Sequence, residues 1–492
     1  MNLNYIFWEK FSAEHYQIVE HQYIEKEFQK ISFYRDDNYK IICKLEGDVE
    51  CNESVSDLLA EKNNLNKGEL INTGKPIKAE KDYIFKAEIE GLRIKNKKEY
   101  LYPIDNQKIT AEGELNCLTT YYETNEQPDY IKFWFLNNEE YTKFFYNIAT
   151  CISGKNETDI ELKGLKKYKV KRLLDRFTYI NSISLKINNK QFIFGYVEKK
   201  YTNDVPGSYL MFTKNNFPDE DELLSIQNTL SFIIGKMFIL IGFTTYNTAW
   251  SPLKNCYFSS NLDDVKHIIS INRMPSIPVD LENVIKYNIY FPKTINKLLK
   301  NYHKYRNIIS LDKIMFYINT SRHLSLSIKM QPLAAALDLF QEGWFKSKYS
   351  KSHGKHLHDE KYAKIISTYI DSITKDLGKN KKTTPPIINR IKTCNNISIR
   401  ERHEVMFREI GLPIGKIEQS ALKGRNVVVH GALKSKDYEE MLILTRAYYS
   451  LLNRLMLKIL KYDGFYIDYS TFGYPCRKIN EPLGGPKGNG II

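Results

Sequence analysis

The apolar residues of this chain change their period once, close to Pro278. Up to about residue 215, short runs rich in Ile, Tyr, Phe and Thr are separated by turn sequences such as Asp36-Asp37-Asn38. After Pro278, apolar residues recur every three or four positions, as they do across residues 323–345. Runs broken by turns are typical of β-strands, and a spacing of three to four is typical of helices that bury one face. The sequence therefore predicts an α+β protein, in which a β-rich N-terminal region (an antiparallel sandwich or sheet) precedes an all-α region.

The expected elements can be placed from these runs and the turns between them. The predicted strands are residues 30–35, 39–45, 83–92, 108–122, 130–136, 180–187 and 191–197. A helix should begin at the acidic run 219–222, because acidic side chains suit a helix N-terminus, and should end near Met237, with further strand after it. The later predicted helices are 281–290, 293–306, 311–319, 323–345, 359–377, 387–394, 399–409, 414–423 and 435–462. Residues 379–386 are expected to form a basic loop, and the last helix to start at Ser435 or Asp437 and close at Gly464.

A chain of 492 residues is too long for one ordinary core, so two or three domains are expected. We predict a β-rich region at 1–275, to which the family resemblance described below assigns a sensing or regulatory role, a helical connector at 280–320, a helical domain at 321–470 and a flexible tail at 480–492. The aromatic runs Phe133-Trp134-Phe135 and Phe144-Phe145-Tyr146 are expected in strand cores rather than as platforms for stacked bases.

Charge is concentrated in one part of the chain. The formal net charge is +14, and residues 346–403 hold 14 Lys and Arg against 5 Asp and Glu, a net of +9. An excess of this kind favours a polyanionic partner such as nucleic acid, although a solvated charged surface gives the same count.

Cysteine usage and the apolar runs indicate the compartment. Seven cysteines are scattered without CxxC spacing, which argues against a disulfide framework or a zinc ribbon and for a reducing environment. The N-terminus has no basic region followed by a long apolar one, and the best apolar run, 230–243, is too short and mixed to span a bilayer. We therefore expect a soluble cytoplasmic protein without a membrane partner.

The segment with the clearest chemistry is Gly424-Arg425-Asn426-Val427-Val428-Val429-His430-Gly431. A histidine can move a proton near neutral pH, and an arginine can hold a phosphate and stabilise the charge that develops on it. An Arg–His spacing of five has a roughly one-in-three chance of occurring once among fifteen arginines and ten histidines, so the context must support it. Asn426 and His430 are four apart and share a helix face, and the segment lies between predicted helices, just after the basic stretch.

Positions five apart on a helix differ by about 140° around its axis, so Arg425 and His430 do not point the same way. They can converge at the mouth of a helix or across two copies of the chain. The alternative is an arginine at a helix start, a surface histidine and valines in the core.

The segment resembles the Arg-Asn-x3-His signature of HEPN-domain ribonucleases, within a helical region at about 320–465. Residues 328–345, with Ala334-Ala335-Ala336-Leu337-Asp338, are similar to the opening helix of that family, where this chain has Asp338 instead of the usual Glu. A β-rich region before a HEPN domain is similar to the ApeA group of bacterial anti-phage proteins. The resemblance implies a metal-independent endoribonuclease in which His430 acts as acid or base, Arg425 stabilises the phosphate, and Asn426 orients one of them. It also implies a homodimer or higher homo-oligomer through the HEPN domain, an RNA substrate such as tRNA, an unknown phage-derived trigger and no cofactor.

Further side chains are candidates for support of this site. Asp338 and His403 could assist catalysis, and RNA contacts are expected from Lys355, His356, Lys379, Lys381, Lys382, Arg390, Lys392, Arg400 and Arg402. Residues 352–359 include three histidines and an aspartate, but the neighbouring lysines oppose a cation, so we predict no metal site there. Two other functions stay open: a non-catalytic RNA- or protein-binding helical module, and a toxin neutralised by a separate antitoxin.

Overall fold

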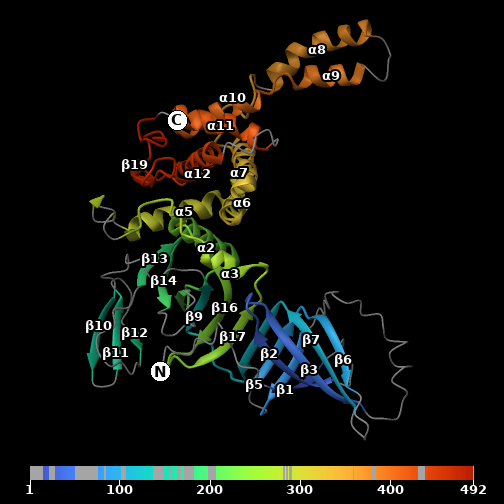
Figure 1. Ribbon diagram of the computed structural model, residues 1–492, viewed down its shortest axis with the longest axis vertical. Helices are drawn as coiled ribbons and strands as arrows, with labels where there is room; N and C mark the ends of the chain where they lie inside the picture. Colours follow the sequence, from blue (N-terminus) through green and yellow to red (C-terminus); the bar gives the residue numbers. More distant parts are fainter. Residues whose placement is uncertain are drawn as a thin grey trace. The chain divides into compact units, whose positions relative to one another are not determined.

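The computed structural model of the chain forms two compact units (Figure 1). Unit 1 consists of Met1–Glu220 and Lys236–Asn272, and unit 2 of Asp221–Gly235 and Arg273–Ile492. The chain thus leaves unit 1 once, returns to it, and leaves again. The structure describes residues 15–20, 28–49, 76–82, 85–100, 107–136, 149–154, 157–162, 168–170, 182–197, 207–280, 283, 286–287, 291–357, 359–377, 384–429 and 438–490.

Unit 1 is dominated by one large antiparallel sheet, which confirms the predicted β-rich N-terminal part. Within the described residues the sheet has 14 strands, and every neighbouring pair is antiparallel. In spatial order they are β13 (Ser182–Ile187), β14 (Lys190–Val197), β15 (Gly207–Thr213), β9 (Tyr130–Leu136), β16 (Ile239–Tyr246), β17 (Pro252–Phe258), β8 (Cys117–Tyr122), β5 (Phe85–Glu90), β4 (Ile77–Lys81), β1 (His15–Glu20), β2 (Phe28–Arg35), β3 (Ile41–Val49), β7 (Gln107–Leu115) and β6 (Arg93–Tyr100). A small sheet of β10 (Ala149–Gly154), β11 (Glu157–Leu162) and β12 (Tyr168–Val170) and the helix α3 (Val265–Ser270) complete the described elements of this unit.

The central strand β9 shows why aromatic runs here are core. Phe133, Trp134 and Phe135 are all buried, so both faces of the strand are covered rather than one. Lys132 is buried beside them, with its ammonium 5.2 to 5.6 Å from the ring centroids of Trp134 and three other aromatic residues. The expectation of strand core is confirmed for 133–135; residues 144–146 lie outside the described residues.

One predicted strand was wrong in extent. Residues 108–122 form two strands, β7 and β8, which pair with different neighbours. Asn116 separates them, and its backbone N–H donates to the carbonyl of Glu90, 3.1 Å away. The apolar residues continue on both sides of Asn116, with Leu115 before it and Leu118 after it, so the apolar pattern alone does not mark the break.

Unit 2 is mainly helical. Its described helices are α2 (Glu220–Ile234, of which residues 221–234 belong here), α5 (Phe291–Ile309), α6 (Leu311–His323), α7 (Leu326–Lys346), α8 (Asp359–Asp376), α9 (Thr384–Thr393), α10 (Ile399–Ile410), α11 (Lys416–Val429) and α12 (Tyr438–Ile459). A hairpin of β18 (Phe465–Ile467) and β19 (Cys476–Lys478) follows them. Helix α7 packs against α5, α6, α10, α11 and α12, so it forms the centre of the unit.

Three local predictions for this unit differ from the structure. Helix α9 begins at Thr384 and includes Pro385 and Pro386, which we had placed in the loop; proline is favoured in a first helical turn, where its missing N–H costs nothing. Helix α12 ends at Ile459 rather than near Gly464, and Lys461 takes the left-handed conformation just beyond it. Residues 480–490, expected as a flexible tail, pack into the unit, because Leu483 is buried and the N–H of Gly484 donates to Asp468 at 2.8 Å.

Candidate functional site

The predicted site residues that the structure describes belong to unit 2, and the helix pair α10–α11 organises them. Ser398 and Glu401 form a capping box that starts α10. Gly411 ends the helix in the left-handed conformation, with φ of 73°, and the N–H of Leu412 returns to the carbonyl of Phe407 at 2.8 Å. The chain then turns within a few residues into α11, which brings the two helices side by side.

A buried ion pair fixes α11 in the unit. Glu418 in its first turn pairs with Arg454 of α12, and both side chains are fully buried. The Glu418 carboxylate also accepts from the N–H groups of Gly415 and Leu483, at 3.0 and 2.8 Å. Burial raises the pKa of Glu418, and the Arg454 charge and these donors oppose that rise. Because Arg454 and the two N–H groups all bind the Glu418 carboxylate, they fix the position of the first turn of α11.

The core-facing side of α11 is formed by small and aliphatic residues. Ile417 and Ala421 are buried, and Gly424 is buried against α12. A Cβ atom at Gly424 would lie 2.7 Å from Cδ1 of Leu444, so the glycine permits the close approach of the two helices.

The backbone positions of Arg425 and Asn426 are in the last part of α11, which corrects the prediction that the motif lies between helices. The predicted helix ends at residue 423, whereas α11 continues to Val429. His430 lies outside the described residues, directly after Val429. The roles predicted for Arg425, Asn426 and His430 therefore stay predictions.

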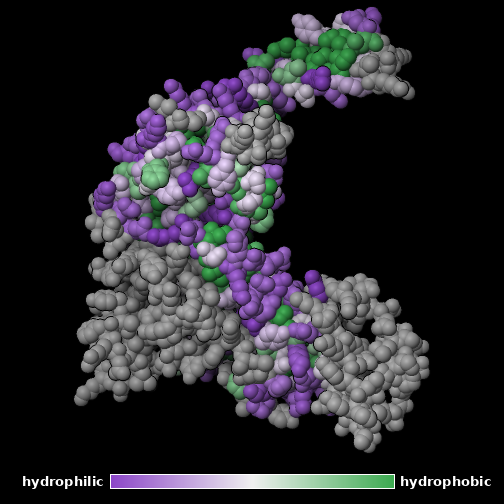
Figure 2. Space-filling model, in the orientation of Figure 1, coloured by the Kyte–Doolittle hydropathy of each residue, from purple (hydrophilic) through white to green (hydrophobic). Residues whose placement is uncertain are grey.

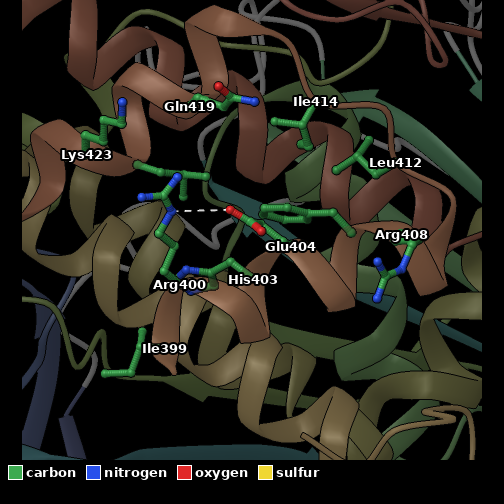
Figure 3. A pocket seen from close by; sticks show the side chains of 11 residues that line it. Ile399, Arg400, His403, Glu404, Arg408, Leu412, Ile414, Gln419 and Lys423 are labelled. Carbon is green, nitrogen blue, oxygen red and sulfur yellow. Dashed lines mark hydrogen bonds and ion pairs between the residues drawn. The ribbon is translucent and has the colours of Figure 1, made fainter. Parts of the chain in front are cut away.

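A pocket of about 580 Å³ lies between α10 and α11, directly before this segment (Figure 3). Its floor is apolar and buried, with Phe407 and Leu412 exposed by only 2% and 3%. Its rim carries charged and polar side chains. The lining residues on α11 are Gln419, Leu422 and Lys423.

The pocket has two chemically different ends (Figure 3). Arg400 and Lys423 lie at one end, and Leu412 and Ile414 lie at the other, together with Arg408. Arg400 is exposed and pairs with Glu404 at 3.3 Å, one turn further along α10. An exposed pair of this kind is weak, so its guanidinium is available to a stronger anion.

The register of α11 links the pocket to the motif. Position 426 lies seven residues after Gln419, four after Leu422 and three after Lys423. Residues at these spacings share one face of a helix, so position 426 lies on the pocket side of α11, about 6 Å along the axis from Leu422. Position 425 is three residues after Leu422 and borders that face.

The two residues predicted to support catalysis have different environments. His403 on α10 lines the pocket, is 6% exposed and stacks nearly parallel to Phe407, with ring centroids 6.2 Å apart. Asp338 on α7 is half-buried and is not among the lining side chains. It lies three residues before Gln341, whose side-chain amide donates to the carbonyl of Ile399 at 3.2 Å. The structure thus brings His403, but not Asp338, to the pocket.

The predicted RNA-contacting residues are divided between several places. Arg400 is at the pocket, whereas Arg402 stacks on Phe345, with its guanidinium 5.1 Å from the ring centroid. Lys355 pairs with Asp359, and the backbone N–H of His356 donates to the carbonyl of Asn395 at 2.9 Å. Arg390 and Lys392 are exposed on the last turn of α9. The remaining three predicted residues, Lys379, Lys381 and Lys382, lie outside the described residues.

Several pocket residues gave no signal in the sequence. The sequence pattern predicts core positions for Phe407, Leu412 and Leu422. It predicts ordinary charged surface positions for Arg408 and Lys423. Lys423 lies three residues before Asn426. A predicted helix that continued through Val427–Val429 would have placed these two residues on one face and so indicated Lys423.

Helices α8 and α9 carry an exposed apolar surface (Figure 2). No side chain of α8 is buried, and Tyr369 is 60% exposed, with Ile365 and Ile387 also exposed. The described residues contain no group of three or more His, Cys, Asp or Glu side chains that could hold a metal ion; His358 lies outside them. In the part of the chain that the structure describes, no helix combines the length and apolar character of a membrane span.

Comparison of the chain with protein-family models, with curated proteins and with solved structures finds no match.

Proposed function

We propose that unit 2 is a metal-independent endoribonuclease of the HEPN type. The observation that carries this proposal is the register of α11, which puts position 426 on the same face as a pocket with cationic side chains at its near end. A phosphodiester needs a cation to hold it and a group to move its proton. Arg400 and Lys423 line the pocket as cations, and the Arg425–His430 segment, which follows Lys423 in the sequence, supplies the histidine.

In this proposal His430 takes the proton of the ribose 2′-hydroxyl or gives one to the leaving 5′-oxygen. Arg425 stabilises the charge on the pentacoordinate phosphate, and Asn426 orients His430 or the phosphate. Attack by the 2′-hydroxyl breaks the bond to the 5′-oxygen, so the products carry a 2′,3′-cyclic phosphate and a 5′-hydroxyl. Chemistry of this type requires no metal ion.

The experiment is cleavage of total RNA, with the ends mapped, by the purified chain and its variants. We expect His430→Ala and Arg425→Ala to lower the cleavage rate by at least about 100-fold, because general acid–base catalysis alone contributes about 10²–10⁴-fold. His267→Ala, which removes an exposed histidine of unit 1, should cleave at the parent rate. Cleavage should continue in the presence of EDTA. An RNA with 2′-deoxyribose at the cut position should not be cleaved there, because it lacks the attacking 2′-hydroxyl. Undiminished cleavage by a folded His430→Ala protein would refute the assignment.

We further propose that the site is completed by a second copy of the chain, because positions five apart on an ideal helix differ by about 140°, so that one helical copy would not bring Arg425 and His430 together. An Arg425→Ala chain mixed with a His430→Ala chain then restores one site with both groups intact, and about a quarter to a half of the activity should return. No recovery in a mixture shown to exchange subunits would contradict a shared site.

For the whole chain we propose a cytoplasmic anti-phage effector similar to the ApeA group, in which the β-rich region senses a phage-derived cue and restrains the nuclease, with tRNA as a substrate. A free ribonuclease harms its own cell, which is the reason to expect restraint. Expression of the intact chain alone should be harmless until phage infection; toxicity without infection would favour a toxin that needs a separate antitoxin.

The second candidate, a non-catalytic binding module, is favoured by the exposed apolar surface of α8 and α9. It requires that Arg425 and His430 be dispensable while Ile365→Asp or Tyr369→Asp abolishes function. The RNA cleavage experiment separates it from the nuclease.

A further inference from the structure

We infer that the pocket between α10 and α11 is a nucleotide subsite, which receives one nucleotide of an RNA strand beside the phosphate to be cut. This inference rests on the proposed function and adds a recognition element to it. Neither the Arg-x4-His spacing nor the basic stretch requires such a pocket.

Size and lining fit a nucleotide better than a bare phosphate. The volume of about 580 Å³ falls within the roughly 300–1,000 Å³ range of pockets that bury ligands of drug size, which is the size of a nucleoside monophosphate. A phosphate would occupy a small part of this space and would gain nothing from the apolar floor. A base has two apolar faces and a polar edge, which suits a floor of Phe407, Leu412 and Leu422 under a polar rim.

The two ends of the pocket set the direction of the nucleotide. Two cations, Arg400 and Lys423, lie at the end that leads to position 426, whereas Arg408 lies at the other end with the apolar Leu412 and Ile414, so the phosphate belongs beside the pair (Figure 3). The base then extends toward Leu412 and Ile414. On the way it passes Glu404 and Gln419, which can accept from the amino or imino groups of a base edge, and Gln419 can also donate.

His403 contributes a second ring to the same side of the pocket. It is four residues before Phe407, so both rings lie on one face of α10, with an angle of 18° between their planes. In this proposal His403 forms part of the wall of the pocket and is not a group that reacts.

The test measures binding rather than cleavage, so that it stands apart from the nuclease proposal. The full chain carrying His430→Ala is titrated against a fluorescein-labelled oligoribonucleotide of about ten residues, with anisotropy as the readout. The pocket variant adds Arg400→Ala and Lys423→Ala. The matched control adds Lys300→Ala and Lys313→Ala, which removes the same charge from exposed positions on α5 and α6 that do not line the pocket.

We expect the pocket variant to weaken binding at least tenfold and the control by less than threefold. Gln419→Trp, which fills the pocket from an exposed position, should also weaken binding at least tenfold while the thermal unfolding curve stays that of the parent. Equal weakening by both double variants, or parent affinity in folded Gln419→Trp, overturns the inference.

Competition identifies the form in which the nucleotide is bound. An excess of a nucleoside monophosphate that displaces the labelled strand shows that a free nucleotide is sufficient. If free nucleotides fail while Gln419→Trp still weakens the strand, the nucleotide is recognised only within RNA, which also supports the subsite. Displacement by ribose 5-phosphate as effective as by the nucleotide would overturn the role of the base.

The result can be separated from the nuclease proposal. Pocket-dependent binding together with absent cleavage by the parent chain would refute the nuclease and keep the nucleotide subsite. Cleavage that depends on His430 but is indifferent to Gln419→Trp would refute the subsite alone.

Discussion

At the scale of single residues, the site depends on a buried ion pair that lies outside it. Glu418→Gln removes one charge and leaves Arg454 buried with its positive charge unbalanced, although its bonds to the carbonyls of Pro413 and Ile479, both 3.1 Å, remain. Breaking a buried pair in this way costs about 3–5 kcal/mol, so we expect the free energy of unfolding to fall by that amount in urea denaturation. Glu404→Gln, which breaks the exposed pair with Arg400, should change it by less than about 1 kcal/mol. Equal effects of the two substitutions would contradict the role given to Glu418.

Single residues also show what the sequence could predict of the site. Arg400 and His403 could be found, because they are cationic or titratable and lie near the motif. Phe407, Leu412 and Leu422 could not, since an apolar residue on a helix gives the same signal whether it faces a core or a pocket. Arg402 was expected to contact RNA, but its partner Phe345 comes from α7, which no local pattern of the sequence reveals.

At the scale of elements, Glu409 joins α10 to its neighbours. Its carboxylate accepts from the indole of Trp344 on α7 at 2.7 Å and from the N–H groups of Lys351 and Ser352 at 3.2 and 3.0 Å. Burial alone would raise the pKa of Glu409, but these hydrogen bonds outweigh it and hold the pKa below its usual range.

A pKa lowered by folding makes the stability depend on pH in one direction. The contribution of Glu409 is present above pH 4.5, the value of an unperturbed glutamate, and is lost as the pH falls through the lowered pKa of the folded state. We therefore expect the difference in unfolding free energy between the parent and Glu409→Gln to be constant at neutral pH and to shrink below pH 4.5. Urea denaturation of both proteins at several pH values measures it, and a difference that grows as the pH falls would contradict this assignment.

The elements themselves were predictable to different degrees. Helices with a regular apolar spacing, such as α7 and α10, were placed within a few residues. Helix α11 continues through Val427–Val429, where the local helix propensity is weak, whereas the prediction ends it at residue 423. This difference of six residues decides whether position 426 is assigned to a loop or to the pocket face.

At the scale of the whole molecule, the two units are not consecutive stretches of the sequence, because a segment of unit 2 lies between two segments of unit 1. Helix α2 follows the strands in sequence, so the predicted boundary at residue 275 places it in the N-terminal region, but residues 221–235 belong to unit 2. Its side chains contact α5 and α6: Ser225 lies 3.1 Å from His303, Asn228 donates to Asp312 at 2.8 Å, and Asp221 pairs with Arg306 at 2.5 Å. Such a crossing cannot be read from periodicity, because the helix has the same amphipathic pattern in either unit.

Because α2 belongs to unit 2, a fragment made of residues 273–492 lacks one helix of its own unit. The hydrogen bond from Asn228 to Asp312 and the pair of Asp221 with Arg306 are lost with that helix, so the melting temperature should fall by about 4 °C or more. Thermal unfolding followed by circular dichroism should detect this, and a peptide of residues 219–236 added in excess should reverse it, because a ligand of the folded state raises its stability. The same peptide with Ile226→Asp and Leu230→Asp should not. A fragment that melts at the same temperature with and without the parent peptide would show that unit 2 is complete without α2, and that the proposed nuclease is specified by residues 273–492 alone.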